Sequence, residues 1–212
     1  MNAKGFTGWD VLILLTTVTL LMGLVFLASG PCYSARAKRV QCCYNLKAIA
    51  LCLRMWANDH EEQFPMTVSS AKGGAREAAL SGDPVPIFVI ASNEIVSPKV
   101  LLCTADKERP SRASVFERLG AKNLSYLVGV DASETNVYSI LIADRNIILP
   151  GEDQPAGLLT IASWQAAEWS PKIHNQQGNV ALADGSASQT AQKGLERALG
   201  STGLATNRFA VP

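Results

Sequence analysis

The segment Lys4-Gly5-Phe6-Thr7-Gly8-Trp9-Asp10 stands directly before an uncharged apolar run, Val11 to Ser29, and these two stretches decide the fold. A run of this length matches the roughly 20 residues that a helix needs to cross about 30 Å of hydrocarbon. The sequence therefore predicts one membrane-spanning helix over residues 11–29, with a single acidic residue, Asp10, at its head.

Asp10 has two interpretations. Aspartate is favoured at the N-terminus of a helix, where its carboxylate accepts backbone hydrogen bonds and complements the macrodipole. A carboxylate at the edge of a bilayer is also costly unless it is paired, which makes it a candidate functional residue. The first interpretation is local capping of the helix, and the second requires a positively charged partner.

The order Lys4-Gly5-Phe6-Thr7-x-x-Asp10 ahead of an apolar helix resembles the prepilin peptidase signal of type IV pilins and type II secretion pseudopilins. The resemblance implies cleavage between Gly5 and Phe6, N-methylation of the new Phe6 amine, and retention of the apolar helix in the mature protein. It also implies that Asp10 pairs with the Phe6 amine of a neighbouring subunit. The family usually has Glu at this position, so here the carboxylate is on a shorter arm.

Two features of the flanking sequence favour other interpretations. Ala28-Ser29-Gly30 weakly imitates a small-x-small cleavage site, so a cleaved export signal is an alternative. Basic residues also follow the apolar run, whereas only Lys4 and the amino terminus precede it, and this count alone would place the C-terminal domain in the cytoplasm. The basic residues in question are Arg36, Lys38, Arg39 and Lys47.

The pilin resemblance implies the opposite topology. It places the chain in the bacterial inner membrane as a single-pass protein, with its C-terminal domain in the periplasm or on the cell surface. We follow the resemblance, because neighbouring subunits of a filament can neutralise a basic cluster that continues a helix.

The composition fits one membrane segment and one modest globular domain. The 212 residues carry a net charge of +1, with 48% apolar and 17% charged residues. Because there is no strong basic surplus, binding of nucleic acid through a charged surface receives little support.

The five cysteines do not form the CxxC pairs of a zinc site or a redox motif. Cys103 is the only cysteine beyond the N-terminal helix, and Cys42 lies on the predicted inward stripe with Leu46, Ile49 and Leu53. If the domain faces the periplasm, Cys42–Cys103 is the preferred disulfide. Free thiols buried as small hydrophobic side chains are an equally good alternative.

Short elements are expected after the long helix. A helix is predicted near residues 75–80, a helix or buried strand at 86–91, a strand at 100–103, a hairpin from 124–130 and 138–143, strands at 158–161, 179–183 and 186–189, and a last helix from a Thr190 cap to Leu199. The expected fold is α+β and pilin-like. A leader (1–5) precedes a long helix (6–62), and this helix packs on a small antiparallel sheet within residues 63–212.

His174 is followed after nine residues by Asp184-Gly185. This spacing resembles the His-x9-Asp-Gly signature of a large group of prepilin-like proteins. Further agreement with that group comes from residues 39–65, 100–106, 124–126 and 143–146, so the resemblance covers most of the chain. One departure is Thr104, where the group commonly has Pro after the cysteine.

The motif has a structural and a chemical interpretation. We expect Asp184-Gly185 to form a tight turn, in which the Asp side chain bonds to its own backbone and Gly adopts positive φ. His174 would brace that turn. A catalytic Cys103–His174 pair is the chemical alternative. The sequence offers no Gly-x-Ser-x-Gly elbow and no paired catalytic carboxylates at a recognisable spacing, so we expect no enzymatic activity.

No cofactor is expected, with calcium as an alternative because some pseudopilins bind calcium in the loops of the sheet domain. Oxygen ligands could come from Asp131, Glu134, Asp144 and Asp184, but there is no contiguous EF-hand-like spacing and no ligands are assigned.

The preferred hypothesis is a non-enzymatic filament subunit of a type II secretion or type IV pilus-like system. Its partners would be further copies or other pseudopilins, the prepilin peptidase, the inner membrane and the assembly machinery. The rival hypothesis is a periplasmic enzyme or ligand-binding domain that uses the same helix only as a tether.

Overall fold

The computed structural model describes residues 7–28, 31–109 and 111–212. The chain divides into two compact units, Met1–Ala37 and Lys38–Pro212, which we call the N-terminal unit and the globular unit. The boundary falls inside the predicted long helix, so residues 38–62 belong with the sheet domain.

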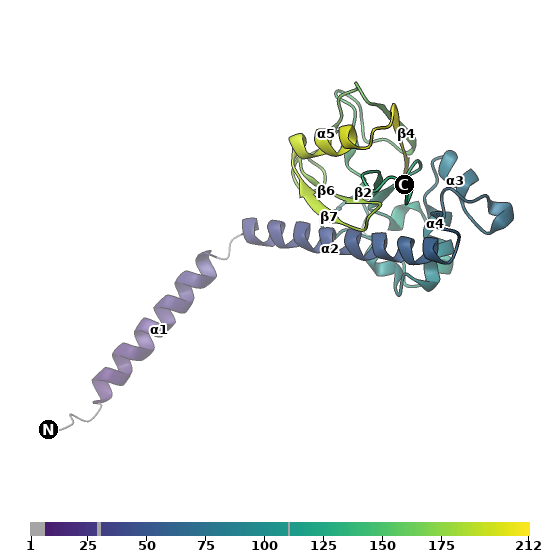
Figure 1. Cartoon of the computed structure of the whole chain (residues 1–212). Coiled ribbons are helices and arrows are strands. Elements are labelled where there is room, and N and C mark those ends of the chain that lie inside the picture. The colour runs from purple at the N-terminus through teal and green to yellow at the C-terminus, as the bar shows by residue number, and fades with distance from the viewer. Residues whose placement is uncertain (1–6, 29–30, 110) are drawn as a thin grey trace. The chain divides into compact units, whose positions relative to one another are not determined.

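The N-terminal unit contains α1 (Gly8–Ala28), which overlaps the predicted membrane helix (Figure 1). Within the described part of the chain, it is the one helix that is long and apolar enough to cross a membrane, and its window Gly8–Val25 is exposed throughout. The hydroxyls of Thr16, Thr17 and Thr19 donate to carbonyls three or four residues earlier in the helix. These bonds satisfy the polar side chains within the helix, as a lipid environment requires.

The second helix, α2 (Pro31–Asn58), contributes its residues from Lys38 onward to the globular unit. It ends four residues before the predicted boundary at 62. Residues 59–62 form a turn in which Glu61 and Glu62 adopt left-handed φ values of 57° and 58°. Such values are incompatible with a continuing right-handed helix. The residues between α1 and α2 lie outside the described ranges.

A six-stranded antiparallel sheet, in the order β4-β8-β1-β2-β6-β7, forms the centre of the globular unit. Its strands are β1 (Tyr126–Gly129), β2 (Ile140–Asp144), β4 (Gly157–Ala162), β6 (Gly178–Leu182), β7 (Ala187–Thr190) and β8 (Thr206–Val211). A separate two-stranded ladder joins β3 (Ile147–Ile148) and β5 (Glu168–Trp169).

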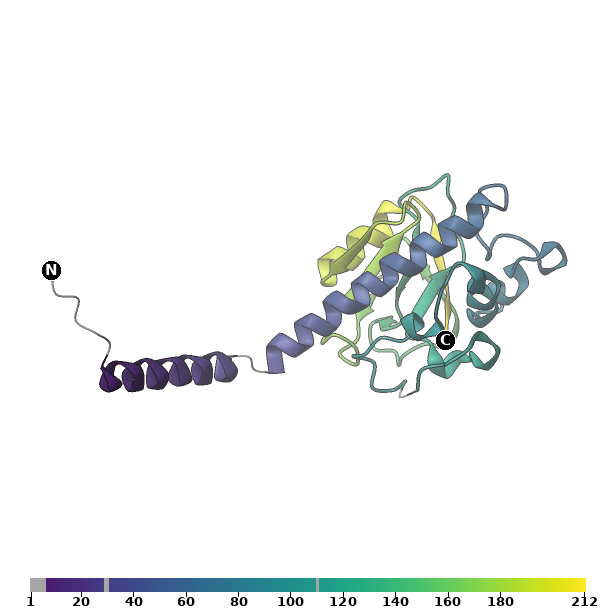
Figure 2. The same cartoon turned by 90° about the horizontal axis from the view of Figure 1, so that it is seen from below.

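Helices cover both faces of the sheet. On one face, α2 packs with α3 (Arg76–Leu80) and α4 (Val85–Ile90), as Figures 1 and 2 show for the globular unit. On the other face, α5 (Gln192–Ser201) packs with the β3–β5 ladder. Because strand side chains alternate, Tyr126 and Val128 of β1 face α2, whereas Leu127 faces α5. The sheet therefore separates two apolar cores.

Several predicted elements are present. The structure has both hairpins, β1–β2 and β6–β7, the strand at 158–161 and the helix near 75–80, and residues 85–90 form a helix rather than a strand. These elements give the chain an α+β fold.

Two predictions are wrong, and three strands are not predicted, namely β8 and the two short strands β3 and β5. Residues 98–101 form a 3-10 helix instead of a strand, because Ser97 caps a turn that begins with Pro98. Thr190 ends β7 and does not cap α5, whose N-cap is Ala191 without a side-chain bond. Of these three strands, β8 belongs to the main sheet, where it lies between β4 and β1.

Candidate functional site

The predicted processing and assembly residues lie at the head of α1. Gly5 and Phe6 are outside the described residues. Asp10 is described, and its Oδ2 accepts hydrogen bonds from the backbone N–H and the hydroxyl of Thr7, at 2.8 and 2.7 Å. Thr7 immediately precedes the helix, so the contacts of Asp10 within its own chain are those of a capping residue.

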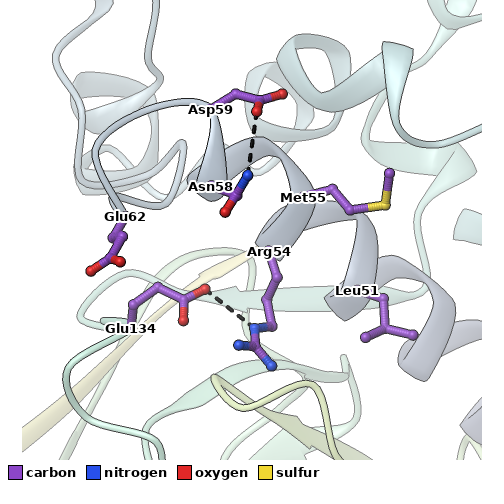
Figure 3. A pocket seen from close by; sticks show the side chains of 7 residues that line it. All are labelled: Leu51, Arg54, Met55, Asn58, Asp59, Glu62 and Glu134. Atoms are coloured by element: carbon purple, nitrogen blue, oxygen red, sulfur yellow. Dashed lines mark hydrogen bonds and ion pairs between the residues drawn. The ribbon is translucent and has the colours of Figure 1, made fainter.

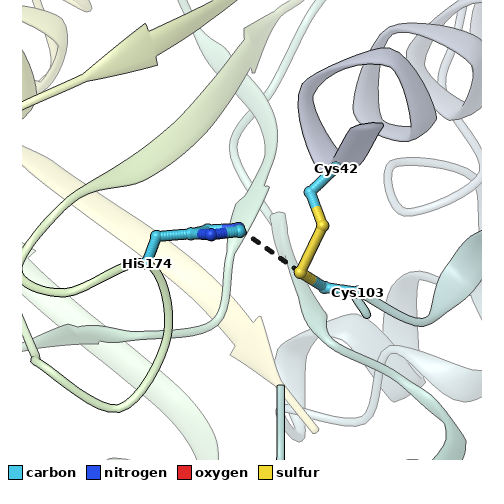
Figure 4. Close-up of side chains that lie close together, drawn as sticks. All are labelled: Cys42, Cys103 and His174. Carbon is cyan, nitrogen blue, oxygen red and sulfur yellow. Dashed lines mark hydrogen bonds between the residues drawn. A yellow bond between two sulfur atoms is a disulfide. The ribbon is translucent and has the colours of Figure 1, made fainter. Parts of the chain in front are cut away.

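The globular unit brings Cys42, Cys103 and His174 together between α2 and the sheet. Cys42 and Cys103 are joined by a disulfide, the pair that the sequence analysis preferred, with 5.5 Å between their Cα atoms. His174 Nε2 lies 3.3 Å from Cys103 Sγ (Figure 4). Both cysteines are fully buried, and the His174 side chain is only 1% exposed. Since Cys103 is disulfide-bonded and enclosed, it is not poised as a catalytic nucleophile.

Asp144 completes this cluster from the end of β2. Its Oδ2 lies 3.6 Å from His174 Nε2 and accepts two hydrogen bonds of 2.8 Å, from the backbone N–H and the side-chain Nδ2 of Asn179. The register explains the contact, because Asp144 and Asn179 are neighbours across the β2–β6 ladder and both project toward α2. We call Cys42, Cys103, His174 and Asp144 the buried cluster.

Burial shifts the pKa values of the two titratable groups in opposite directions. Desolvation raises the pKa of Asp144 to about 7, although the bonds from Asn179 favour its charged form. Desolvation, followed by the charge of Arg39, lowers the pKa of His174 to about 4. At neutral pH the imidazole is therefore uncharged, and the carboxyl is close to its midpoint.

The loop that carries His174 has an unusual backbone. His174, Asn175 and Gln176 have φ values of 56°, 53° and 58°, a left-handed turn that costs roughly 1–2 kcal/mol per residue. Asn146, which is fully buried, holds the loop by donating from Nδ2 to carbonyls on both sides of it, at 3.0 to 3.1 Å. The acceptors are the carbonyls of Ser170, Ile173 and Gln177. Asn146 is thus a positioning residue for His174.

The Asp184-Gly185 turn lies at the other end of β6. Asp184 Oδ1 accepts from Ser186 N at 2.8 Å, and Gly185 has a φ of 84°, so the turn has the predicted form. The side chain of His174 points instead to Cys103 and Asp144, so the expectation that it braces this turn is wrong. The two halves of the motif are separated by the length of β6, roughly 14 Å.

Each half of the motif contacts α2. His174 touches the disulfide to Cys42, whereas the Asp184 carbonyl accepts from Arg54. A Cβ added at Gly185 would lie 3.0 Å from Leu51 Cδ2, which shows how closely the turn approaches the helix. Cys42 and Arg54 are 12 residues apart, or about 18 Å along a helix, comparable with the span of β6. The motif therefore fixes α2 to the sheet at two points.

An open groove of about 570 Å³ lies beside the C-terminal turns of α2 (Figure 3). Two of its lining residues, Arg54 and Glu134, form an ion pair of 3.3 Å between Nε and Oε1. Its lining residues are Leu51, Arg54, Met55, Asn58, Asp59, Glu62 and Glu134.

The four oxygen donors considered for calcium do not converge in the described structure. Asp131 pairs with Arg208, Glu134 pairs with Arg54, Asp144 bonds to Asn179, and Asp184 caps its own turn. Among the described residues, the group of three potential metal-ligating side chains brought together is Cys42, Cys103 and His174.

Sequence reasoning missed the roles of Asp144, Asn146 and Asn179. The sequence does carry one signal for the first two of them, because the run Ala143-Asp144-Arg145-Asn146 places three polar residues at the end of an apolar strand. Arg145 is also buried and forms a two-point ion pair with Asp106, at 2.7 and 2.8 Å.

No protein-family model, no curated protein and no solved structure matches the chain.

Proposed function

We propose that the chain is a non-enzymatic structural subunit, similar to a pseudopilin, of a type II secretion or type IV pilus-like filament. In this proposal α1 anchors it in the bacterial inner membrane, the prepilin peptidase removes residues 1–5, and the globular unit faces the periplasm or the cell surface. The observation that carries the proposal is α1 itself, an exposed apolar helix headed by the carboxylate of Asp10.

The position of Asp10 supports an intermolecular role in addition to capping. Its described contacts are with Thr7 and use Oδ2 alone. A carboxylate has roughly four lone-pair sites, so it can accept from a further donor while it caps the helix. A terminal ammonium on a neighbouring copy would supply the opposite charge that an acid at a bilayer edge requires.

The outer side of α2 supports packing against further copies of the chain. Val40, Tyr44, Leu51 and Met55 are exposed, and they recur at spacings that place them on one side of the helix, away from the stripe buried on the sheet. Exposed apolar stripes on a helix typically mark protein interfaces. In the proposed filament, neighbouring subunits cover this stripe.

Three substitutions of Asp10 separate pairing from capping. Asp10→Asn keeps an oxygen acceptor for Thr7 but removes the charge, Asp10→Glu restores the charge on a longer arm, and Asp10→Ala removes both. If the charge pairs with a neighbouring amine, Asn and Ala both abolish filament assembly and Glu retains it, while all three chains still insert in the membrane. Assembly by the Asn variant at the parent level would refute the pairing role.

Processing is tested separately by mass spectrometry of the N-terminus. The full chain is expressed in cells with an active prepilin peptidase and in matched cells without one. The proposal expects a methylated Phe6 start only in the first. An intact N-terminus in both, together with monomeric protein, would favour the tethered enzyme or ligand-binding domain.

A further inference from the structure

The buried cluster has the donor set of a metal site as well as that of a disulfide. The ligand atoms of Cys42, Cys103 and His174 all lie within 4.8 Å of one another. Thiolate and imidazole together favour zinc and similar ions. The inference below does not depend on the filament function proposed above.

The distances around His174 Nε2 match those between ligands of a tetrahedral ion. With metal–nitrogen and metal–sulfur bonds of about 2.05 and 2.3 Å, nitrogen and sulfur ligands lie about 3.6 Å apart, and nitrogen and oxygen ligands about 3.4 Å apart. His174 Nε2 is 3.3 Å from Cys103 Sγ and 3.6 Å from Asp144 Oδ2. The nitrogen and the sulfur are thus at a separation suitable for two ligands of one ion, and the Asp144 carboxylate lies beside the imidazole but outside the group of three mutually close ligand atoms.

Asp144 provides a second, independent observation. It is fully buried, and its Oδ1 has no hydrogen-bond partner among the described residues. A buried carboxylate oxygen without a partner costs free energy, and a positive ion bound in the same cluster is one way to offset that cost. Asn179 fixes the other oxygen through two bonds, so the carboxylate is held beside His174 as a supporting group of the site.

The surroundings of the sulfur and the nitrogen are also suitable. Ala105 N donates to Cys103 Sγ at 3.4 Å, a contact that stabilises a thiolate. Arg39 lies close enough to His174 for its positive charge to act on the ring. Such a charge would offset part of the negative charge of two thiolates and a carboxylate around one divalent ion.

We propose that the dithiol form of Cys42 and Cys103, together with His174, supplies three ligands to a thiophilic divalent ion of the zinc class, and that the neighbouring carboxylate of Asp144 supports this site. A newly made chain carries the two cysteines as thiols, so the ion and the disulfide are alternative occupants of one pocket. Binding replaces the two S–H bonds by metal–sulfur bonds and releases two protons. Oxidation to the disulfide removes the two thiolate ligands.

The test uses the full chain in detergent with Cys32, Cys43 and Cys52 replaced by Ser, which leaves only the pair. A trialkylphosphine reduces the disulfide: with water it gives two thiols and the phosphine oxide, and it is then removed without air. Cobalt(II) is added as the probe, because thiolate coordination produces charge-transfer absorption and tetrahedral geometry produces intense visible bands. Zinc(II) is then added as a competitor.

The expected result is one cobalt ion per chain with a tetrahedral spectrum, displaced by zinc and absent from the oxidised chain. His174→Gln should lower the affinity at least about tenfold, and Asp144→Asn about 10- to 100-fold. His60→Gln, a change at the other histidine, should leave the titration unchanged. Zinc should also raise the melting temperature of the reduced chain, as any ligand of the folded state does.

Three results would overturn the proposal. The first is a cobalt affinity of the His174→Gln chain equal to that of the parent. The second is a tetrahedral cobalt spectrum from the oxidised chain. The third is a reduced chain that neither folds nor becomes more stable when zinc is added.

Discussion

His174 Nε2 and Asp144 Oδ2 face each other at 3.6 Å inside the globular unit, and their pKa values are shifted in opposite directions. Folded Asp144 keeps its proton up to about pH 7, whereas the unfolded group loses it near 3.8. Between these values the folded state binds more protons, so the free energy of unfolding falls as pH rises. Folded His174 loses its proton near 4 and the unfolded ring near 6.5, so its contribution rises with pH.

In the parent chain, between about pH 4 and 6.5, Asp144 makes the free energy of unfolding fall with pH and His174 makes it rise, so the two effects oppose each other. Asp144→Asn leaves the histidine alone, so the free energy of unfolding should rise with pH, by at most about 1.4 kcal/mol per unit. His174→Gln leaves the carboxyl alone, so the free energy should fall as pH rises toward 7. Denaturation of the full chain in detergent, followed by near-UV circular dichroism at several pH values, measures both slopes. If the free energy of unfolding changed with pH in the same direction in both variants, the opposite pKa shifts of Asp144 and His174 would be contradicted.

The Cys42–Cys103 disulfide closes a loop with a sequence separation of 61 residues. A loop of this length predicts a stabilisation of about 4 kcal/mol from the lost entropy of the unfolded chain. Replacing both cysteines by Ser should therefore lower the free energy of unfolding by a few kcal/mol. Replacing Cys43 and Cys52, which are free, is the matched control and should cost less. Equal losses in the two double variants would show that the pair is not joined in the folded protein.

Features that depend on residues close together in the sequence could be predicted, whereas features that depend on the pairing of distant strands could not. The inward stripe of α2 has helical periodicity, and the hairpins are bounded by turn residues, so both could be read from the chain. Asp144 reaches Asn179 and His174 only because β2 and β6 pair in one register, and short sequence patterns do not encode that pairing. For the same reason the motif alone predicts that His174 braces the Asp184-Gly185 turn, although β6 separates the two residues.

Gly185 is required by both conformation and space. Its φ of 84° is unfavourable for any residue with a Cβ, and that atom would lie 3.0 Å from Leu51 Cδ2. Gly185→Ala should destabilise the globular unit by about 1–2 kcal/mol. Gly200→Ala is the matched control, because Gly200 lies within α5 with open space around its Cβ position and should gain up to about 1 kcal/mol. Thermal unfolding of the two chains should thus shift in opposite directions.

Asn146 holds the His174 loop through its Nδ2 donors, and Asn146→Asp replaces those donors by oxygen while preserving shape. The new carboxylate would face three carbonyl oxygens in a buried position, so a loss of about 3 kcal/mol or more is expected. Faster amide exchange at residues 173–177 would show that the loop has been released. Asn58→Asp, at an exposed position, should change stability by less than about 0.5 kcal/mol. Unchanged exchange in the Asn146 variant would show that the loop is fixed by other contacts.

Two ion pairs of similar geometry allow the effect of burial to be measured. Arg145 and Asp106 have side chains 3% and 1% exposed, whereas Arg208 and Asp131 are 40% and 22% exposed. Arg145→Met leaves the Asp106 carboxylate buried beside an apolar side chain, and should cost roughly 3–5 kcal/mol. Arg208→Met leaves a carboxylate that water can reach, and should cost about 1 kcal/mol or less. Adding Asp106→Leu to Arg145→Met should recover part of the loss, because no buried unpaired charge then remains and Glu108, the other partner of Arg145, keeps its ion pair with Lys172. Equal losses from the two arginine variants in denaturation experiments would mean that the Asp106 carboxylate is hydrated in solution.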